Sequence, residues 1–536
     1  MPRRGAGEVR GAPGPGVSQP AASPPAAPQG ALRSVASAAM LVALGSILSR
    51  LVGFVREPVV AYYFGRGLEV DAFQVAWTVP NIVYDMLIAG AVSATLVPVF
   101  SEYAEGEPDE FWRIVSGVLT LTLAALVAVA ALAIWQAPLL VALLTEPGQT
   151  ELRDLATPLM RLLMPAVLLM GLSGLATAVL HAQRRFLLPA FVMVAFNLGM
   201  VLGVILLHDR IGVSSLAAGA LIGALAQVAL QLPGLRGARP RAGLGAHHPA
   251  VTRIVRLYGP VALGIGFSIV GTVIDRRLAS GFEAALATMR YATTLIQFPL
   301  GLVASAVSLA VLPTLSRQSA AADEGSFRAT LAMGLKVVLL LILPAAAGLA
   351  ALATPITALV FERGRFGGED TAVTALALLL YLPGLPAAAI DQLLIFAFYA
   401  RKNTLTPNLI QGAAILCYLL VALPLLWLTE LGFLALVVGN AAQWVGHALI
   451  TYALLSRAVP LGGLRLGEAA AKGLLASALM AAAVLAVAAL GATLPPLPLV
   501  ALAGGAGALV YLGLCAALRV EALGFFIGAL RARLGR

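Results

Sequence analysis

Several charged side chains lie in one apolar stretch of the chain, between Ser49 and Pro98. Among them are Arg50, Arg56, Glu57, Asp71 and Asp85. A charge near the centre of a membrane helix costs roughly 2.5–3.5 kcal/mol on insertion scales. Charges of both signs in two neighbouring segments are therefore expected to face a shared polar cavity rather than lipid. We interpret this cavity as the substrate path of a transporter.

The composition is that of a polytopic membrane protein. Of the 536 residues, 60% are hydrophobic and only 11% are charged, whereas soluble proteins carry about 25% charged residues. The net charge is +10, and the basic residues lie in short loops between apolar runs. This placement indicates membrane topology rather than nucleic-acid binding. The sequence contains no G-x-x-x-x-G-K-[ST] loop, no Ser–His–Asp or paired-carboxylate arrangement and no metal-ligand cluster. We predict a protein that is not an enzyme and holds neither ATP nor a metal.

About fourteen apolar runs are long enough to cross a bilayer, and they predict an all-α fold. The predicted divisions are a disordered cytoplasmic tail (1–34), an N-lobe of six helices (35–234), a basic cytoplasmic linker (235–254), a C-lobe of six helices (255–456), two further helices (457–520) and an amphipathic C-terminal tail (521–536). Lys and Arg gather in alternate loops, so the positive-inside rule places both termini in the cytoplasm. One loop on that side, SEYAEGEPDEF, is acidic.

Two pairs of segments match across the halves of the chain. AGAVSATLVPVFSEY (89–103) is similar to ASAVSLAVLPTLSRQ (304–318), and LHAQRRFLLP (180–189) is similar to FYARKNTLTP (398–407). The matches predict two copies of a six-helix unit. Because each copy has an even number of helices, the copies should be parallel repeats that face each other across a central cavity.

The first candidate residues are the charges of the first two helices. Arg50 and Glu57 are seven residues apart and share a helical face, whereas Arg56 points about a third of a turn away. A kink at Pro58 could bring both arginines to one cavity. They could bind an anionic headgroup, since Arg suits phosphate, or form an internal network with acidic residues. Asp71, at the start of the second helix, could be functional or could be a first-turn cap.

The second half offers Asp275, late in the segment 255–280, and Arg290, early in the segment 286–316. Asp275 could bind an ion or a proton, or could pair with a neighbouring arginine. Lys336 and Asp391 are isolated charges that we interpret as bundle contacts.

These motifs together resemble the MurJ/MviN family of the multidrug/oligosaccharidyl-lipid/polysaccharide exporters. The resemblance spans roughly residues 35–456 and rests on SRLVGFVRE, VDAF with VPNIV, GAVSATLVPVFSEY, RRFLLPAFVMVAFN, IDRRLASG, QFPLGL and FYARKNTLTP. It implies fourteen helices, two lobes and a flippase for lipid II, the undecaprenyl-pyrophosphate-linked peptidoglycan precursor. It also implies that Arg50, Arg56 and Asp71 match family positions and that Asp275 stands where an acid helps to bind sodium in some members.

The chain departs from the family pattern at several cavity positions. Tyr84 and Asp85 stand where the family usually supplies an arginine, and Thr294 stands where it supplies another. Arg290 lies one turn before Thr294 and could reach the same volume. At the sodium-site positions of the eleventh helix, this chain has Tyr418 and Ala422.

The expected function is a lipid II flippase of the bacterial plasma membrane that works by alternating access. Arg50, Arg56, Asp71 and Arg290 are the predicted substrate-binding residues, and Asp275 is the candidate site for Na⁺ or H⁺ coupling. The membrane potential or an ion gradient would drive the cycle. The alternatives are a flippase for another polyprenyl-linked glycan and a non-transporting membrane scaffold that binds cell-wall synthesis proteins.

Overall fold

The computed structural model describes residues 29–89, 95–238 and 248–524. Every regular element in these ranges is helical, which confirms the predicted all-α fold. Residues 1–28, part of the basic linker and most of the predicted amphipathic tail lie outside the described residues. The first helix begins at Gln29, before the predicted boundary at residue 35.

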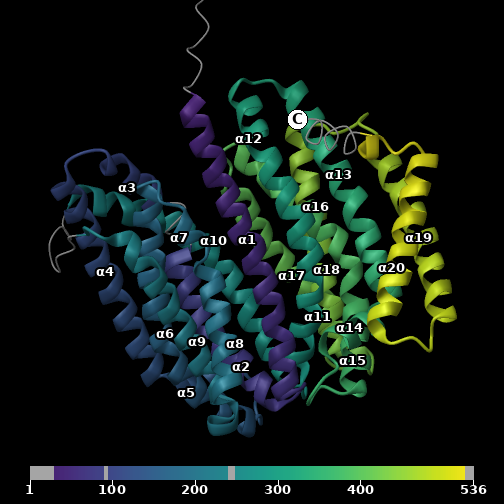
Figure 1. The fold of residues 1–536 in the computed structure, drawn as a ribbon, viewed down its shortest axis with the longest axis horizontal. Helices are drawn as coiled ribbons and strands as arrows, with labels where there is room; N and C mark the ends of the chain where they lie inside the picture. The colour runs from purple at the N-terminus through teal and green to yellow at the C-terminus, as the bar shows by residue number, and fades with distance from the viewer. Residues whose placement is uncertain (1–28, 90–94, 239–247, 525–536) are drawn as a thin grey trace, which may run out of the picture.

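The first half of the chain forms one bundle (Figure 1). Its elements are α1 (Gln29–Phe64), α2 (Leu68–Tyr84), a π-helical turn (Asp85–Ala89), α3 (Val97–Ala104), α4 (Pro108–Trp135), α5 (Ala137–Leu144), α6 (Thr150–Ala182), α7 (Leu187–Ala190), α8 (Val192–Ile211), α9 (Ser214–Gln231) and a 3₁₀ turn (Leu232–Leu235).

The second half forms a second bundle, with the last two helices at its outer edge (Figure 1). Its elements are α10 (Pro249–Ser280), α11 (Ala285–Leu300), a π-helical turn (Gly301–Ser305), α12 (Ala306–Ala320), α13 (Glu324–Ala351), α14 (Ala353–Phe361), α15 (Gly368–Tyr381), a 3₁₀ turn (Leu382–Gly384), α16 (Leu385–Ala400), α17 (Leu405–Leu428), α18 (Leu434–Ala458), α19 (Leu466–Leu490) and α20 (Pro496–Ala517).

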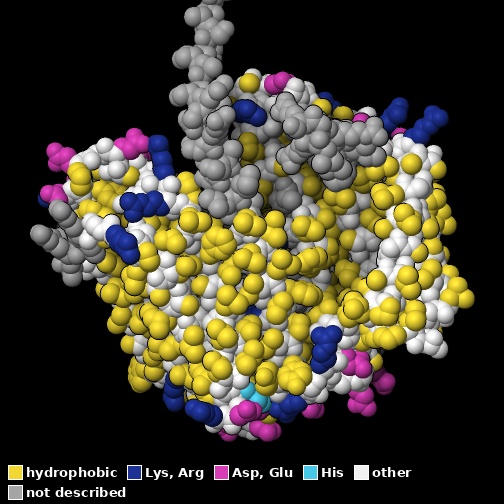
Figure 2. Space-filling model, viewed as in Figure 1, with side chains coloured by type: hydrophobic (Ala, Val, Ile, Leu, Met, Phe, Trp, Pro, Cys, Tyr) yellow, Lys and Arg dark blue, Asp and Glu magenta, His cyan; other side chains and the backbone are white. Residues whose placement is uncertain are grey.

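The surface divides into an apolar belt and two charged ends (Figure 2). Within the described ranges, 11 helical segments are long and apolar enough to cross a membrane. The expected segments outside this set are α1, the α2–α3 pair and α10. The count of fourteen therefore stays a prediction, while the multi-pass membrane class is confirmed.

Several predicted segments are divided where the sequence disfavours a continuous α-helix. Pro138 lies at the start of α5, and Pro383 is the second residue of the 3₁₀ turn between α15 and α16. Proline lacks the backbone N–H and clashes with the preceding turn, so it favours a new helix start. The matched segments 89–103 and 304–318 share a different interruption, a π-helical turn. Each segment begins within such a turn, 85–89 or 301–305, and includes residues of an α-helix farther along the chain.

Helices α8 and α9 approach closely through glycine. Gly199 and Gly203 of α8 face Gly219 and Gly223 of α9, and a Cβ built on Gly203 would overlap the Cα of Gly219. Each pair is spaced G-x-x-x-G, the small-residue pattern that lets membrane helices pack backbone to backbone. This contact fixes α8, which carries cavity residues, against the rest of the first bundle.

We expect Gly203→Val to destabilise the protein, because the added side chain has no space between α8 and α9. Overpacking of this kind costs about 1–3 kcal/mol. The measurement is the thermal unfolding midpoint of the detergent-purified protein. Gly504→Val on α20 is the matched control, since a Cβ there meets no atom within 4 Å. Equal midpoints for the two variants would contradict the prediction.

Two helices lie between the bundles (Figure 1). Helix α1 packs on α7 and α8 and also contacts α11 and α14, while α10 contacts α4 and α5 on one side and α17 on the other. Ion pairs near the start of α10 and between neighbouring loops explain the acidic loop. Glu102 binds Arg253 near the start of α10 at 2.6 Å, and Glu105 binds Arg184. The acids of this loop therefore balance basic residues on the same face.

Candidate functional site

Two adjoining cavities lie between the bundles, and charged groups line both. The first has a volume of about 570 Å³ and is bordered by α1, α8, α11 and α16. The second has a volume of about 410 Å³ and is bordered by α1, α2, α6, α8, α10 and α11. Arg56, Met193 and Arg290 line both, so we call the two together the central cavity. Its position agrees with the cavity predicted from the sequence.

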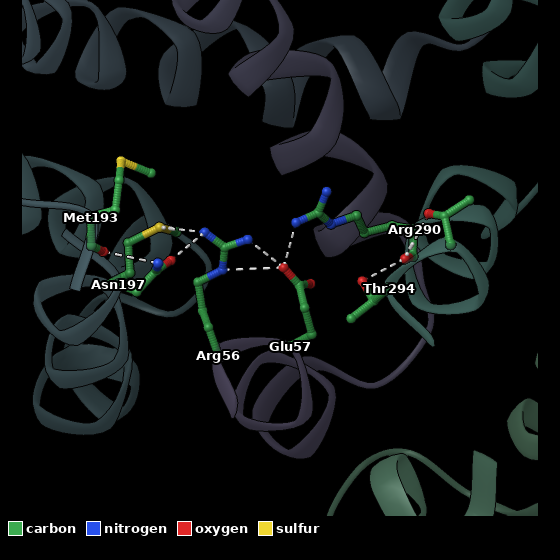
Figure 3. A network of polar contacts seen from close by, with 8 residues as sticks. Arg56, Glu57, Met193, Asn197, Arg290 and Thr294 are labelled. Carbon is green, nitrogen blue, oxygen red and sulfur yellow. Dashed lines mark hydrogen bonds and ion pairs between the residues drawn. The ribbon is translucent and has the colours of Figure 1, made fainter. Parts of the chain in front are cut away.

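Glu57 holds two arginines at the centre of this cavity (Figure 3). Its Oε1 accepts hydrogen bonds from Arg56 Nη2 at 2.5 Å and from Arg290 Nη2 at 2.7 Å. Arg56 Nη1 also donates to Asn197 Oδ1 on α8 at 3.0 Å. Glu57 is only 3% exposed, and such a charge is stable away from water only when it is paired. The internal network considered from the sequence is therefore present, and it joins α1, α8 and α11.

The network still leaves positive charge in the cavity. Two arginines share one carboxylate, and Arg50 lines the same volume. The sequence prediction that Arg50 and Arg56 reach one cavity is confirmed, as is the prediction that Arg290 reaches the volume beside Thr294. An excess of arginine in a polar cavity suits an anion with several oxygen atoms, such as a pyrophosphate. The role of Arg50, Arg56 and Arg290 in substrate binding stays a prediction.

The guanidinium of Arg50 lies in the space that is open because residue 301 is a glycine. A Cβ built on Gly301, in the π-helical turn after α11, would overlap the Arg50 guanidinium. The atoms in the way belong to the far end of a flexible side chain, so a substitution would move Arg50 rather than the helices.

We therefore expect Gly301→Ala to lower transport several-fold while leaving the amount of protein in the membrane unchanged. The displaced guanidinium of Arg50 would no longer line the cavity. The measurement is the initial rate of flipping in proteoliposomes. Gly266→Ala on α10 serves as the control, because a Cβ there meets no atom within 4 Å. An unchanged rate for Gly301→Ala would show that the position of Arg50 does not limit transport.

Asp71 lies outside both parts of the central cavity. It is 2% exposed, and its Oδ1 accepts a hydrogen bond at 2.7 Å from the backbone N–H of Ala287, in the first turn of α11. A carboxylate at that position satisfies a free N–H and favours the positive end of the helix dipole. Asp71 is thus a cap, as one interpretation of the sequence held, but the helix that it caps is in the other bundle.

Asp71 belongs to a set of contacts that join the bundles at one end of the molecule. We call this end the closed face, formed by the turns 65–67, 145–149, 281–284 and 362–367. Arg66 pairs with Asp370 at 3.0 Å, and Glu69 pairs with Arg365 at 3.0 Å. Backbone groups contribute as well, since Tyr291 donates its hydroxyl to the carbonyl of Gly65. Helix α1 begins at the opposite end of the molecule (Figure 1).

At that opposite end, the ion pairs of the described residues do not join the first bundle to α11–α18. They lie within one bundle or tie the start of α10 to the first bundle, as Arg401 with Glu324 and Arg253 with Glu102 do. Among the described residues, the polar contacts that join the two bundles therefore lie at the closed face and in the Glu57 network of the central cavity. This geometry is that of a transporter that is closed at this face.

Asp275 also differs from its expected pairing. Among the described residues it forms no ion pair with arginine. Its Oδ1 instead accepts from Tyr418 Oη at 3.2 Å and from Asn440 Nδ2 at 3.0 Å. This cluster joins α10, α17 and α18 and does not line the central cavity. The expected Asp–Arg pair is wrong because the tyrosine and the asparagine supply the hydrogen bonds instead.

Two polar cavity residues do not follow from the sequence analysis. Asn197 lies within one of the motifs and orients Arg56. Gln74 lines the cavity from α2. A polar side chain inside an apolar helix is the signal that could have found them.

Comparisons with known proteins decide the family. A sequence model described as lipid II flippase MurJ matches residues 60–494. The chain belongs to this family. Relatives include the lipid II flippase MurJ of Burkholderia cenocepacia, which is 30% identical over 68% of this chain and 72% of its own length. The probable lipid II flippase MurJ of Vibrio cholerae is 29% identical over 79% of this chain and 83% of its own length.

Solved structures show the same fold for the MurJ family and more distant transporters. A lipid II flippase MurJ in an inward closed conformation has a TM-score of 0.77 and 23% identity, and it covers 90% of this chain and 99% of that one. An inward-facing MATE family transporter of the MOP superfamily has a TM-score of 0.64 and 12% identity, and it covers 78% and 95%. The prediction of a transporter family rather than an enzyme is confirmed.

Proposed function

We propose that this protein flips lipid II across the bacterial plasma membrane. The observation that carries the proposal is the central cavity between the two bundles, where Arg50, Arg56 and Arg290 line the part that contains the well-paired carboxylate of Glu57. Membership of the MurJ family supports the cargo, because the relatives named above are a lipid II flippase and a probable lipid II flippase. The polyprenyl chain would stay in lipid while the pyrophosphate and the sugars enter the cavity.

Arg50, Arg56 and Arg290 bind the pyrophosphate in this proposal. Arg56 and Arg290 are already oriented by Glu57, so little side-chain freedom is lost when the anion enters. A phosphate oxygen would compete with Glu57 for the arginines. Entry of the substrate therefore loosens the link between α1 and α11 that Glu57 provides.

The cycle is alternating access of the two bundles. With both termini in the cytoplasm, as the basic loops predict, the closed face lies on the outer side of the membrane. Outward opening then requires rupture of the Arg66–Asp370 and Glu69–Arg365 pairs and of the Asp71 cap. Cations in the cavity make the cycle sensitive to membrane potential, since one charge across 100 mV is worth about 2.3 kcal/mol.

Asp275 is the proposed coupling site. Tyr418 and Asn440 both donate hydrogen bonds to the same carboxylate oxygen. Sodium or a proton, the two coupling ions considered from the sequence, would compete with these donors for the carboxylate and so alter how α10 meets α17 and α18.

A flippase for another polyprenyl-linked glycan is the second candidate. The observation that favours it is the replacement of expected cavity arginines by Tyr84, Asp85 and Thr294, all of which line the central cavity. Complementation of a bacterial strain depleted of its own lipid II flippase separates the two candidates. Growth supports lipid II as cargo, and failure of a well-expressed protein contradicts it.

Reconstitution into vesicles tests transport itself. The measurement is the appearance of fluorescent lipid II on the far leaflet with and without an imposed membrane potential. A scaffold that recruits cell-wall synthesis proteins would bind lipid II without moving it, so binding without flipping would contradict the proposed function.

A further inference from the structure

The part of the central cavity beside α2 differs in charge from the part beside α1. We call it the α2 subsite and define it by Trp77, Asn81, Asp85 and Arg276, which line it together. It contains a carboxylate that the arginines of the cavity do not neutralise. This difference needs an explanation, because unpaired charges within a membrane segment are costly and mark functional sites by default.

Glu57 and Asp85 show the contrast directly. Glu57 accepts three hydrogen bonds from Arg56 and Arg290 and is buried. Asp85 accepts only a long contact of 3.5 Å from Asn81 Nδ2, and it makes no ion pair with the residues of the described ranges. Asp85 is exposed and is the first residue of the π-helical turn after α2. Such turns are rare and occur frequently at functional sites.

Arg276 is the complementary group. It enters the α2 subsite from α10 and makes no hydrogen bond or ion pair with another described residue, and its Nε is buried without a partner. A buried donor that lacks a partner costs about 1–3 kcal/mol, more when it is charged. The subsite thus offers one carboxylate and one guanidinium, and neither of them forms an ion pair within 4 Å with another described residue.

Trp77 adds an aromatic wall. Its ring is stacked on Phe73, with centroids 6.1 Å apart, and it also contacts Phe196 at 6.0 Å. These contacts hold the indole in place where it lines the cavity. A rigid aromatic face beside amide and hydroxyl groups suits an amphipathic headgroup with polar edges.

We infer that the α2 subsite binds the amino-acid portion of the headgroup, with Asp85 receiving a free ammonium and Arg276 a carboxylate. The inference rests on the proposed function and refines it. A plain glycan carries no ammonium, whereas a peptide-bearing glycan carries both charges. The chemistry of the subsite therefore favours a glycopeptide cargo, with the pyrophosphate at Arg50, Arg56 and Arg290 and the peptide beside α2.

The test compares two probes on the full-length protein in nanodiscs. One is lipid II with a free amine on the side chain of its diamino acid, and the other is the same molecule with that amine acetylated. We expect acetylation to weaken binding to the unmodified protein about tenfold, which corresponds to about 1.4 kcal/mol. We expect Asp85→Asn to bind both probes equally, because the amide has no charge for the amine.

Two further variants complete the design. Arg276→Gln should weaken both probes by a similar factor and keep the preference for the free amine. Asp391→Asn removes a membrane carboxylate that does not line the cavity, and it should change neither value. Equal binding of the two probes to the unmodified protein, or a preference that survives Asp85→Asn, overturns the inference alone. Failure of the unmodified protein to bind either probe overturns the proposed function and the inference with it.

Discussion

Arg56→Gln is expected to abolish flipping while the protein stays in the membrane at its normal level. The substitution removes one of the three arginines proposed to bind the pyrophosphate and leaves Glu57 with Arg290 as its remaining partner. Truncating one member of a buried charge pair costs about 2–5 kcal/mol, which is roughly 30-fold to more than 1,000-fold in an equilibrium. The measurements are complementation of a flippase-depleted strain and initial flipping rates in vesicles.

A double substitution distinguishes the two roles that Arg56 could have. If Arg56 only neutralises Glu57, then Arg56→Gln with Glu57→Gln should recover activity, because the buried negative charge is gone. If Arg56 binds the pyrophosphate, the double variant should stay inactive. We expect it to stay inactive. Arg56→Lys keeps the charge but loses the planar fork, so we expect it to retain only part of the activity. Full activity of Arg56→Gln would refute the proposed role of this side chain.

A disulfide across the closed face should stop transport reversibly. The Cβ of Glu146, in the turn 145–149, lies 3.8 Å from a Cβ built on Gly281, in the turn 281–284. This is the mean Cβ–Cβ separation of disulfides. We expect Glu146→Cys with Gly281→Cys to form the bond under oxidising conditions and to lose flipping in proportion to the oxidised fraction. Reduction should restore the rate.

The controls for this prediction are the two single cysteine variants. Neither can lock the turns together, so both should flip at nearly the normal rate under oxidising conditions. The natural cysteines should not form competing disulfides, because Cys515 is buried and Cys417 is partly buried. Undiminished transport by the fully oxidised double variant would mean that these turns need not separate during the cycle.

Much of the fold could be predicted from the sequence, for a physical reason. Apolar runs of bilayer length leave few alternatives to helices, since backbone polar groups in lipid must be satisfied within the segment. The matched segments 89–103 and 304–318 likewise indicated two related bundles. The positions of the interruptions were less accessible. The π-helical turns 85–89 and 301–305 depend on local packing, and nothing in the apolar pattern separates them from ordinary helix.

The site shows where sequence reasoning ends. Isolated charges in apolar segments identified Arg50, Arg56 and Arg290 correctly as residues of one cavity. Their partners could not be predicted, because Glu57 and Asn197 meet Arg56 through tertiary packing of α1 on α8. Asp71 illustrates the same point. Its place at a helix start predicted a cap, but only the structure shows that the capped helix begins more than two hundred residues later.

The closed face relies on main-chain groups as much as on side chains. The N–H of Ala287, the carbonyl of Gly65 and the pair formed by the N–H of Arg365 and the carbonyl of Tyr62 are all backbone atoms. Every amino acid except proline supplies both atoms, so mutation can change the side chains at Ala287, Arg365 or Tyr62 without deleting these hydrogen bonds. The cavity can therefore be remodelled for a new lipid-linked cargo while the closed face is preserved, provided that Asp71 and Tyr291, the side-chain partners of Ala287 and Gly65, are kept.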